Sequence, residues 1–154
     1  MHYKFVVDTL LNKRPARIVI LGAGGMGGTT LALSSLYDSA VTEHFPSRYF
    51  VSCEAVSAAS TLVGEIANVL RIPPAKRDEH LIDLVLSSFR GNAVLCLDNF
   101  ETTWDIETAR VDVEDSLSHL NHLPQLAILM TTRHAASIRG LLVGALRYFR
   151  LPQN

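Results

Sequence analysis

Five short apolar runs are spaced along the chain, and segments with a helical pattern separate them. The runs are rich in leucine, β-branched and aromatic residues, which is typical of strands that are buried on both faces of a sheet. They cover residues 17–21, 48–53, 92–97, 125–130 and 146–151. Strands that alternate with helices in this way predict an α/β fold, a doubly wound and mainly parallel sheet of about five strands with helices on both faces.

The segments between the runs carry apolar residues at intervals of three and four, as amphipathic helices do. We expect helices over residues 2–12, 29–40, 57–71, 79–90 and 109–122, and a short helix over 135–144. The Asp78 side chain is expected to cap the helix that follows it. The segment after Asp98 and Asn99, which contains Trp104, is expected to form a loop.

Five glycines fall within seven residues directly after the first apolar run. The segment Gly22–Thr30 reads GAGGMGGTT. Because glycine loses more backbone entropy on folding than any other residue, this density favours a loop that binds a ligand. The phosphate-binding pattern G-x-x-x-x-G-K-[ST] is matched at Gly22, Gly27 and Thr29, but Gly28 occupies the position of the lysine.

Three interpretations of this glycine loop stay open at the level of the residues. In the first, backbone N–H groups of residues 24–28 point inward and bind a nucleoside triphosphate, aided by the dipole of the next helix. The Thr29 hydroxyl then becomes a ligand of magnesium. This interpretation also requires an apolar strand that ends in aspartate for the magnesium shell, and the run VLCLD ends at Asp98.

The second interpretation is a dinucleotide-binding loop in a fragment of an NAD- or FAD-dependent oxidoreductase, because residues 22–27 also match G-x-G-x-x-G. Such a loop needs an acidic residue about 20 positions later to bind the ribose. Glu54 ends the next strand but lies 27 positions after Gly27. The third interpretation is a glycine-rich turn without a ligand, in a scaffold or regulator that kept the fold.

Taken together, the segments resemble the STAND class of P-loop NTPases, in the NB-ARC and NACHT group, and look most like fungal NB-ARC-like proteins. The matching segments occur in the family's order over about residues 15–135 and read ILGAGGMGGTTLA, RYFVSCEA, AVLCLDNFETTW and LAILMTTR. The resemblance implies an AAA+-like signalling switch that binds ATP or ADP with Mg²⁺. It also implies a sheet in which the first strand lies beside the fourth.

The resemblance assigns a role to each candidate site residue. Asp98 is the Walker B aspartate, which shares Mg²⁺ with Thr29. Asn99 stands where many relatives carry a second acid, and Arg133 is the sensor that contacts the terminal phosphate. The nucleotide-binding Walker A loop comprises Gly22, Ala23, Gly24, Gly25, Met26, Gly27, Gly28, Thr29 and Thr30.

Two departures from the family pattern lower the activity that we expect. Gly28 removes a lysine whose charge-assisted contact with phosphate is worth about 1.5–3 kcal/mol. Nucleotide affinity is therefore expected to fall by about tenfold to a few hundredfold. Asn99 is not a carboxylate base, so hydrolysis also loses part of its machinery. We expect a weak nucleotide binder with little or no ATPase turnover.

Composition restricts the class of partner. The chain has 154 residues, with 14 Lys and Arg against 15 Asp and Glu, a formal net charge of −1. This balance indicates neither nucleic acid nor an anionic membrane as a partner. The length fits one P-loop nucleotide-binding domain over residues 1–154, either complete or truncated. The apolar segment 140–146 is expected to contact a protein partner or another STAND subdomain.

The two cysteines and the first residues of the chain indicate the cellular compartment in which the protein is expected. Cys53 and Cys96 each lie in an apolar run, so we expect two buried, reduced thiols. Residues 1–15 are too charged for a signal peptide. No apolar run approaches the length of about 20 residues that a membrane span needs. These features predict a cytoplasmic location.

Overall fold

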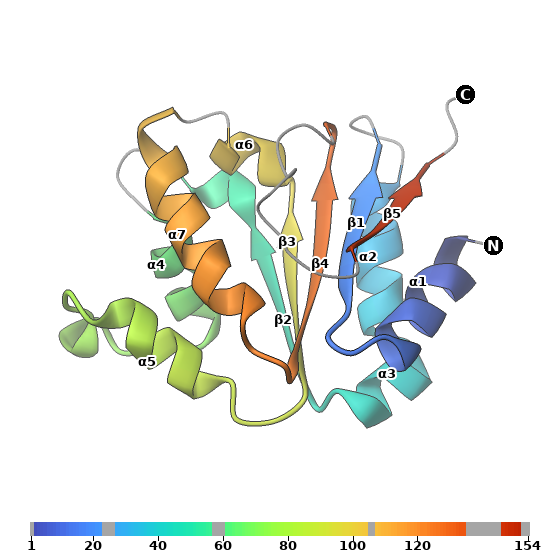
Figure 1. Cartoon of the computed structure of the whole chain (residues 1–154), viewed down its shortest axis with the longest axis horizontal. Coiled ribbons are helices and arrows are strands. Elements are labelled where there is room, and N and C mark those ends of the chain that lie inside the picture. The colour runs from blue at the N-terminus through green and yellow to red at the C-terminus, as the bar shows by residue number, and fades with distance from the viewer. Residues whose placement is uncertain (1, 23–26, 57–60, 105–106, 135–145, 152–154) are drawn as a thin grey trace.

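The computed structural model describes residues 2–22, 27–56, 61–104, 107–134 and 146–151. All five predicted strands are present, and every strand pair in the sheet is parallel (Figure 1). The strand order is β2-β3-β4-β1-β5. The strands are β1 (Arg17–Leu21), β2 (Ser47–Ser52), β3 (Ala93–Asp98), β4 (Leu126–Thr132) and β5 (Leu146–Arg150).

The strand order separates two of the interpretations of the glycine loop. In a dinucleotide-binding Rossmann sheet, the first strand lies beside the second. Here β1 lies between β4 and β5, and β2 pairs with β3 instead. The first strand therefore lies beside the fourth, as the resemblance to P-loop NTPases predicted, and the sheet does not have the Rossmann order.

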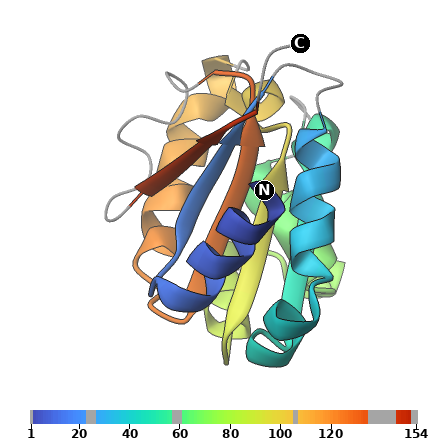
Figure 2. The same cartoon turned by 90° about the vertical axis from the view of Figure 1, so that its right-hand side faces the viewer.

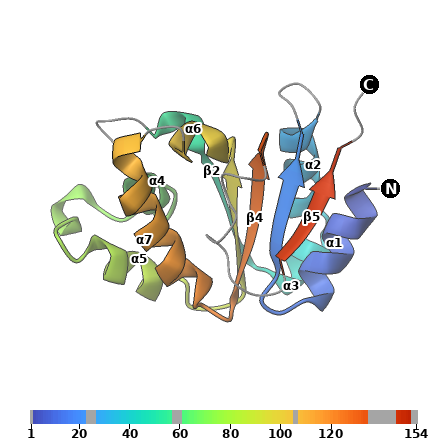
Figure 3. The same ribbon diagram turned by 45° about the horizontal axis from the view of Figure 1, so that its top comes forward.

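Helices cover both faces of the sheet, as predicted (Figure 3). One face packs against α1 (His2–Asn12), α2 (Gly28–Leu36) and α3 (Ser39–His44). The other face packs against α4 (Leu62–Val69), α5 (Leu81–Ser88), α6 (Phe100–Trp104) and α7 (Arg110–Asn121). Short 3₁₀ turns cover Cys53–Ala55, Pro74–Lys76 and Glu107–Ala109.

The two helical layers explain why the middle of each central strand is apolar. Ile18 and Ile20 of β1 pack against the layer that contains α1 and α2, whereas Val19 and Leu21 pack against the opposite layer. Successive side chains of a strand point to opposite faces, so a strand covered on both sides is apolar at consecutive positions rather than at alternate ones. The edge strand β5, which lies at the side of the sheet that faces the viewer in Figure 2, differs. Its Phe149 packs against the layer that contains α1 and α2, whereas Tyr148 is 43% exposed.

The helix predicted over residues 29–40 is wrong in its extent. It ends at Leu36, and a separate helix, α3, begins at Ser39. The Asp38 carboxylate accepts hydrogen bonds from the backbone N–H groups of Ala40 and Val41, at 2.9 and 3.3 Å. Aspartate at this position is a strong helix start, and it interrupts an apolar pattern that otherwise continues.

Three other predicted boundaries also change. The helix predicted over 57–71 begins at Leu62, because the Thr61 hydroxyl accepts from the N–H of Gly64 at 3.0 Å. Asp78 accepts from the N–H of His80, but the helix after it begins only at Leu81. The segment predicted as a loop around residue 104 contains α6. The short helix predicted over 135–144 lies outside the described residues.

Cys53 and Cys96 are free and buried, as predicted. Burial raises the pKa of the Cys53 thiol from 9.0 to about 12, and it raises the pKa of Cys96 as well. Within the described part of the chain, no helix has both the length and the apolar character that a membrane crossing requires.

We expect both thiols to resist modification in the folded protein. With a pKa near 12, the thiolate fraction of Cys53 falls by about a thousandfold relative to an ordinary thiol. A colorimetric thiol reagent at pH 8 should therefore titrate two thiols rapidly in denaturant and only slowly without it. Because the folded state keeps the Cys53 proton and the unfolded state loses it, the free energy of unfolding should fall as pH rises from 9 to 12. Fast reaction of either thiol without denaturant would contradict this expectation.

Candidate functional site

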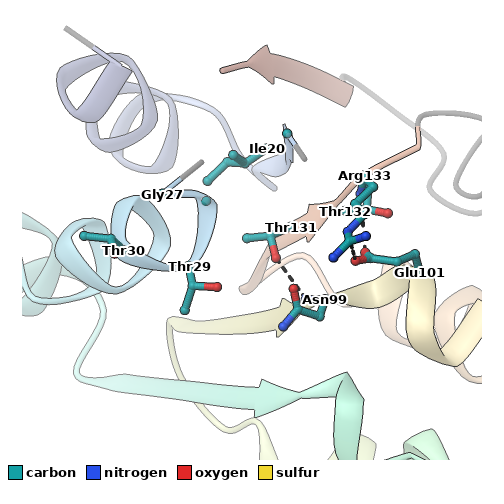
Figure 4. Close-up of a pocket in the computed structure, with 11 residues that line it drawn as sticks. Ile20, Gly27, Thr29, Thr30, Asn99, Glu101, Thr131, Thr132 and Arg133 are labelled. Atoms are coloured by element: carbon teal, nitrogen blue, oxygen red, sulfur yellow. Dashed lines mark hydrogen bonds and ion pairs between the residues drawn. The ribbon is translucent and has the colours of Figure 1, made fainter. Parts of the chain in front are cut away.

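The carboxyl ends of β1, β3 and β4 meet beside the start of α2, at the edge of the sheet where parallel α/β proteins bind ligands. A cavity of about 270 Å³ opens at this point (Figure 4). Seven of the predicted site residues line the cavity: Gly22, Gly27, Gly28, Thr29, Thr30, Asn99 and Arg133. Ile20, Glu101, Thr131 and Thr132 complete the described lining.

The start of α2 has the properties of an anion site. Gly27 precedes the helix with φ of 89°, a left-handed conformation that glycine adopts at little cost. In the part of the chain that the structure describes, no side chain caps this start, and no acidic residue lies in the first turn. The first N–H groups of a helix have no acceptor within the helix and carry a partial positive charge. Ala23, Gly24, Gly25 and Met26, also predicted to bind nucleotide, lie outside the described residues.

Thr29 and Asp98 contact each other, although 68 residues separate them in the sequence. The Thr29 hydroxyl lies 2.9 and 3.0 Å from the two carboxylate oxygens of Asp98, which is 3% exposed. The Thr131 hydroxyl donates to the same carboxylate at 2.6 Å. The strand end and the helix start therefore bring together the two residues predicted to share Mg²⁺.

Asn99 links three strand ends. Its φ of 54° is left-handed, a conformation that asparagine tolerates better than most residues. Its backbone N–H donates to the Thr131 hydroxyl at 2.9 Å. Its side-chain amide donates to Glu54 at 3.1 Å and to Asp98 at 3.2 Å. A carboxylate at this position would face two others, so the amide fits its surroundings better than an acid would.

Arg133 lies across the cavity from α2 and pairs with Glu101 of α6 (Figure 4). Its Nε lies 3.4 Å from one carboxylate oxygen of Glu101, and its backbone N–H donates to the other at 3.3 Å. The Glu101 side chain is 12% exposed, whereas that of Arg133 is 56% exposed. The acid is thus held in place by its surroundings, and the arginine is the more exposed partner.

Sequence reasoning missed Glu101 and Thr131 as site residues. Glu101 follows Asp98 by three residues, so a helix that begins directly after β3 brings both to the same edge. Because the segment after Asn99 was predicted to be a loop, the spacing of three residues between Asp98 and Glu101 was not used. Thr131 reaches Asp98 because β3 pairs with β4, a neighbour relation that only the strand order reveals.

Two glycines of the loop have different structural constraints. A Cβ atom on Gly22 would lie 2.8 Å from Cδ1 of Leu151, which follows β5 and is buried. A side chain at position 22 would therefore require Leu151 to shift. A Cβ atom on Gly28 would lie no closer than 3.8 Å to the described residues that pack around it, so their packing does not exclude a side chain there.

Comparison with known proteins agrees with this arrangement. The model of the family described as NB-ARC domain matches residues 2–139, which is most of the chain. The chain therefore belongs to the NB-ARC domain family. The match begins earlier than the segments of resemblance in the sequence, and it includes α1. No curated protein matches this NB-ARC chain in sequence.

Solved structures share the fold of this NB-ARC domain at low sequence identity. The Orc1 protein of Aeropyrum pernix, solved in complex with DNA, has a TM-score of 0.72 and 14% identity, over 99% of this chain and 44% of that one. Cdc6p from Pyrobaculum aerophilum has a TM-score of 0.66 and 17% identity, over 97% and 44%. The Walker-type ATPase PABY2304 of Pyrococcus abyssi has a TM-score of 0.61 and 10% identity, over 97% and 52%.

These structural matches confirm the P-loop NTPase fold predicted from the sequence, of the AAA+-like kind. The NB-ARC domain spans about half of the length of these three structures, or less. The family and the fold together support a nucleotide-binding module.

Proposed function

We propose that this NB-ARC domain is the ATP- or ADP-binding switch module of a STAND-type signalling protein, with weak affinity and little or no hydrolysis. The observation that carries the proposal is the contact between the Thr29 hydroxyl and the Asp98 carboxylate, at 2.9 and 3.0 Å, beside an uncapped helix start. A helix start that receives phosphate and an adjacent hydroxyl–carboxylate pair are two of the parts that a P-loop uses.

The phosphates are expected to bind at the start of α2. Gly27 and Gly28 leave the backbone accessible there, and no side chain caps the first N–H groups. The partial positive charge of these groups favours an anion. This attraction comes from the main chain and does not depend on the missing lysine.

The donors at Thr29 and Asp98 fit Mg²⁺. Magnesium prefers oxygen ligands and is commonly bound through one or two carboxylates, the phosphates of the substrate and several waters. The Thr29 hydroxyl, which lines the cavity, and the buried Asp98 carboxylate behind it supply oxygens of this kind. Bound Mg²⁺ would neutralise phosphate charge, which partly compensates for the absent lysine.

Little hydrolysis is expected because the carboxylates near the cavity already have partners. Glu101 contacts Arg133, and Asp98 accepts from Thr29, Thr131 and Asn99. The amide of Asn99 donates hydrogen bonds and has no basic function. Among the described residues that line the cavity, Arg133 is the one cation, and Glu101 already contacts it.

A panel of nucleotides tests the proposal. We expect Mg-ATP and Mg-ADP to raise the melting temperature by a few degrees at a concentration of about ten times Kd, and NAD and FAD to leave it unchanged. A shift with NAD or FAD alone would favour the dinucleotide interpretation. No shift with any nucleotide up to millimolar concentration would favour a scaffold that binds none.

Removing the Thr29 hydroxyl should weaken the magnesium-dependent part of binding. We expect Thr29→Val to lower the affinity for Mg-ATP by about tenfold and to leave ATP binding in EDTA unchanged, since loss of a metal ligand affects only the loaded site. Isothermal titration calorimetry measures both affinities. Thr42→Val is the matched control, because Thr42 lies in α3 and its hydroxyl donates to Ser39. Equal losses with and without magnesium would argue against a metal at Thr29.

The partners remain predictions. The segment 140–146, expected to contact a protein partner or another STAND subdomain, lies outside the described residues. The near-zero net charge supports the expectation that this domain binds neither nucleic acid nor membrane. The Aeropyrum pernix protein was solved in complex with DNA, but this domain spans only 44% of that chain. The cytoplasmic location also stays a prediction.

A further inference from the structure

We infer that Glu101 determines how strongly the site prefers ATP over ADP, because it competes with the terminal phosphate for Arg133. The inference rests on the proposed nucleotide binding, and it concerns the regulation of that site. The family resemblance implied a contact of Arg133 with the terminal phosphate but gave no role to Glu101. The structure supplies the contact between them.

The two residues occupy the side of the cavity opposite the phosphate-binding helix. In Figure 4, Gly27 and Thr29 lie on the α2 side, Glu101 and Arg133 lie on the far side, and Asn99 and Thr131 lie between them. A diphosphate seated at the start of α2 occupies the near side. The third phosphate of ATP would extend from there toward Arg133. Only ATP, and not ADP, would then compete with Glu101 for the Arg133 guanidinium.

Of the two residues in this ion pair, Arg133 is the one that can change partner, and Glu101 is fixed in place. The Glu101 side chain is 12% exposed, and one of its oxygens accepts from the backbone N–H of Arg133. The Arg133 side chain is 56% exposed, and its Nε lies 3.4 Å from Glu101. A half-exposed ion pair at this separation is weak. Phosphate carries more charge than a carboxylate and forms stronger bonds with a guanidinium, so it can displace Glu101.

Glu101 therefore affects ATP in a way that ADP does not share. Its carboxylate holds Arg133 when the far side contains no phosphate, and ATP must break that contact to gain its own. Replacing the charge with a neutral group of the same shape weakens the competitor and keeps an acceptor for the N–H of Arg133. Affinity for ATP should then rise, while affinity for ADP should stay nearly constant.

The test compares Kd for Mg-ATP and Mg-ADP by calorimetry, in the natural sequence and in a Gly28→Lys background that brings both affinities into a measurable range. We expect Glu101→Gln to tighten ATP binding by about fivefold, the size of a partly exposed ion pair, and to change ADP binding by less than about twofold. Glu114→Gln is the matched control, because Glu114 is exposed on α7, and it should change neither value.

The double variant distinguishes competition for Arg133 from simple repulsion of phosphate. Arg133→Gln should abolish the difference between ATP and ADP, and adding Glu101→Gln to it should have no further effect. A gain in ATP affinity that persists without Arg133 would overturn the inference, and so would an unchanged ratio of ATP to ADP affinity in Glu101→Gln. Failure of every variant to bind either nucleotide, including Gly28→Lys, would reject the proposed function itself.

Discussion

Replacing Gly28 by lysine is expected to tighten ATP binding by about tenfold to a few hundredfold. The estimate follows from one charge-assisted hydrogen bond to phosphate, worth about 1.5–3 kcal/mol. Position 28 is the first residue of α2 and lines the cavity with Thr29. A lysine there joins a site that already has a helix start and a hydroxyl–carboxylate pair.

The geometry at position 28 makes this substitution a clean test. A Cβ atom there meets Leu151, Ile20 and Thr131 only at 3.8 to 3.9 Å, which is ordinary van der Waals contact. Position 28 is helical, and lysine is a better helix former than glycine, so the fold should not suffer. The variant therefore changes the charge at the cavity with little structural cost.

A matched control removes the effect of net charge. Gly91→Lys adds the same charge at a position where a Cβ atom has no neighbour within 4 Å, and Gly91 does not line the cavity. Calorimetry with Mg-ATP and Mg-ADP should show the gain for Gly28→Lys alone. Equal affinities of Gly28→Lys and the natural sequence would mean that the loop does not hold phosphates.

Turnover should recover less than binding in Gly28→Lys. The lysine restores charge near the phosphates, but Asn99 still provides an amide where hydrolysis needs a base. A gain in binding without an equal gain in turnover would therefore separate the effect of Gly28 on affinity from the effect of Asn99 on hydrolysis.

The strands were predictable because burial on both faces forces continuous apolar runs, and all five runs form strands. The helix ends were less predictable, because single side chains decide them. Asp38 divides the apolar pattern after α2 by capping α3, and Thr61 delays the start of α4. Such caps compete with periodicity, and periodicity alone does not reveal which prevails.

Some residues of the candidate site were likewise predictable from the sequence, and others were not. Thr29 and Asp98 were predicted as partners from a motif and a strand end, and the structure brings them into hydrogen-bond distance. Glu101 depends on where α6 begins, and Thr131 depends on β4 lying beside β3. These positions follow from the three-dimensional arrangement of elements, which local residue patterns do not contain.

Replacing Arg17 by methionine is expected to destabilise the fold by about 3–5 kcal/mol, a large part of the total for a domain of this size. Arg17 begins β1 and is 1% exposed. Its guanidinium donates to the Asn121 side chain at 2.7 Å, to the carbonyl groups of Ala16 and Asn121 at 2.9 Å each, and to that of Leu123 at 3.3 Å. It also donates to the Leu126 carbonyl.

These bonds tie the first strand to the end of α7 and to the connection that enters β4. Burial lowers the pKa of Arg17 to about 10, so the guanidinium remains charged at neutral pH. Its hydrogen bonds to Ala16, Asn121, Leu123 and Leu126 go to carbonyl and amide oxygens rather than to a carboxylate. Methionine has a similar length but no donor.

The comparison with buried ion pairs explains why the loss should be large. Replacing both members of such a pair by apolar residues is often neutral, because no polar group is left behind. In Arg17→Met the Leu126 carbonyl stays in place and loses this donor, and a buried acceptor left unsatisfied costs about 1–3 kcal/mol. The Leu123 carbonyl also loses the guanidinium but keeps the N–H of Leu126 as a donor at 3.3 Å. Urea denaturation followed by circular dichroism measures the difference. Arg90→Met is the control, because Arg90 is exposed. Arg17→Lys should lower the free energy of unfolding by an intermediate amount, since one ammonium replaces only part of the set of donors. Equal stability of Arg17→Met and Arg90→Met would show that these bonds contribute nothing net to the folded state.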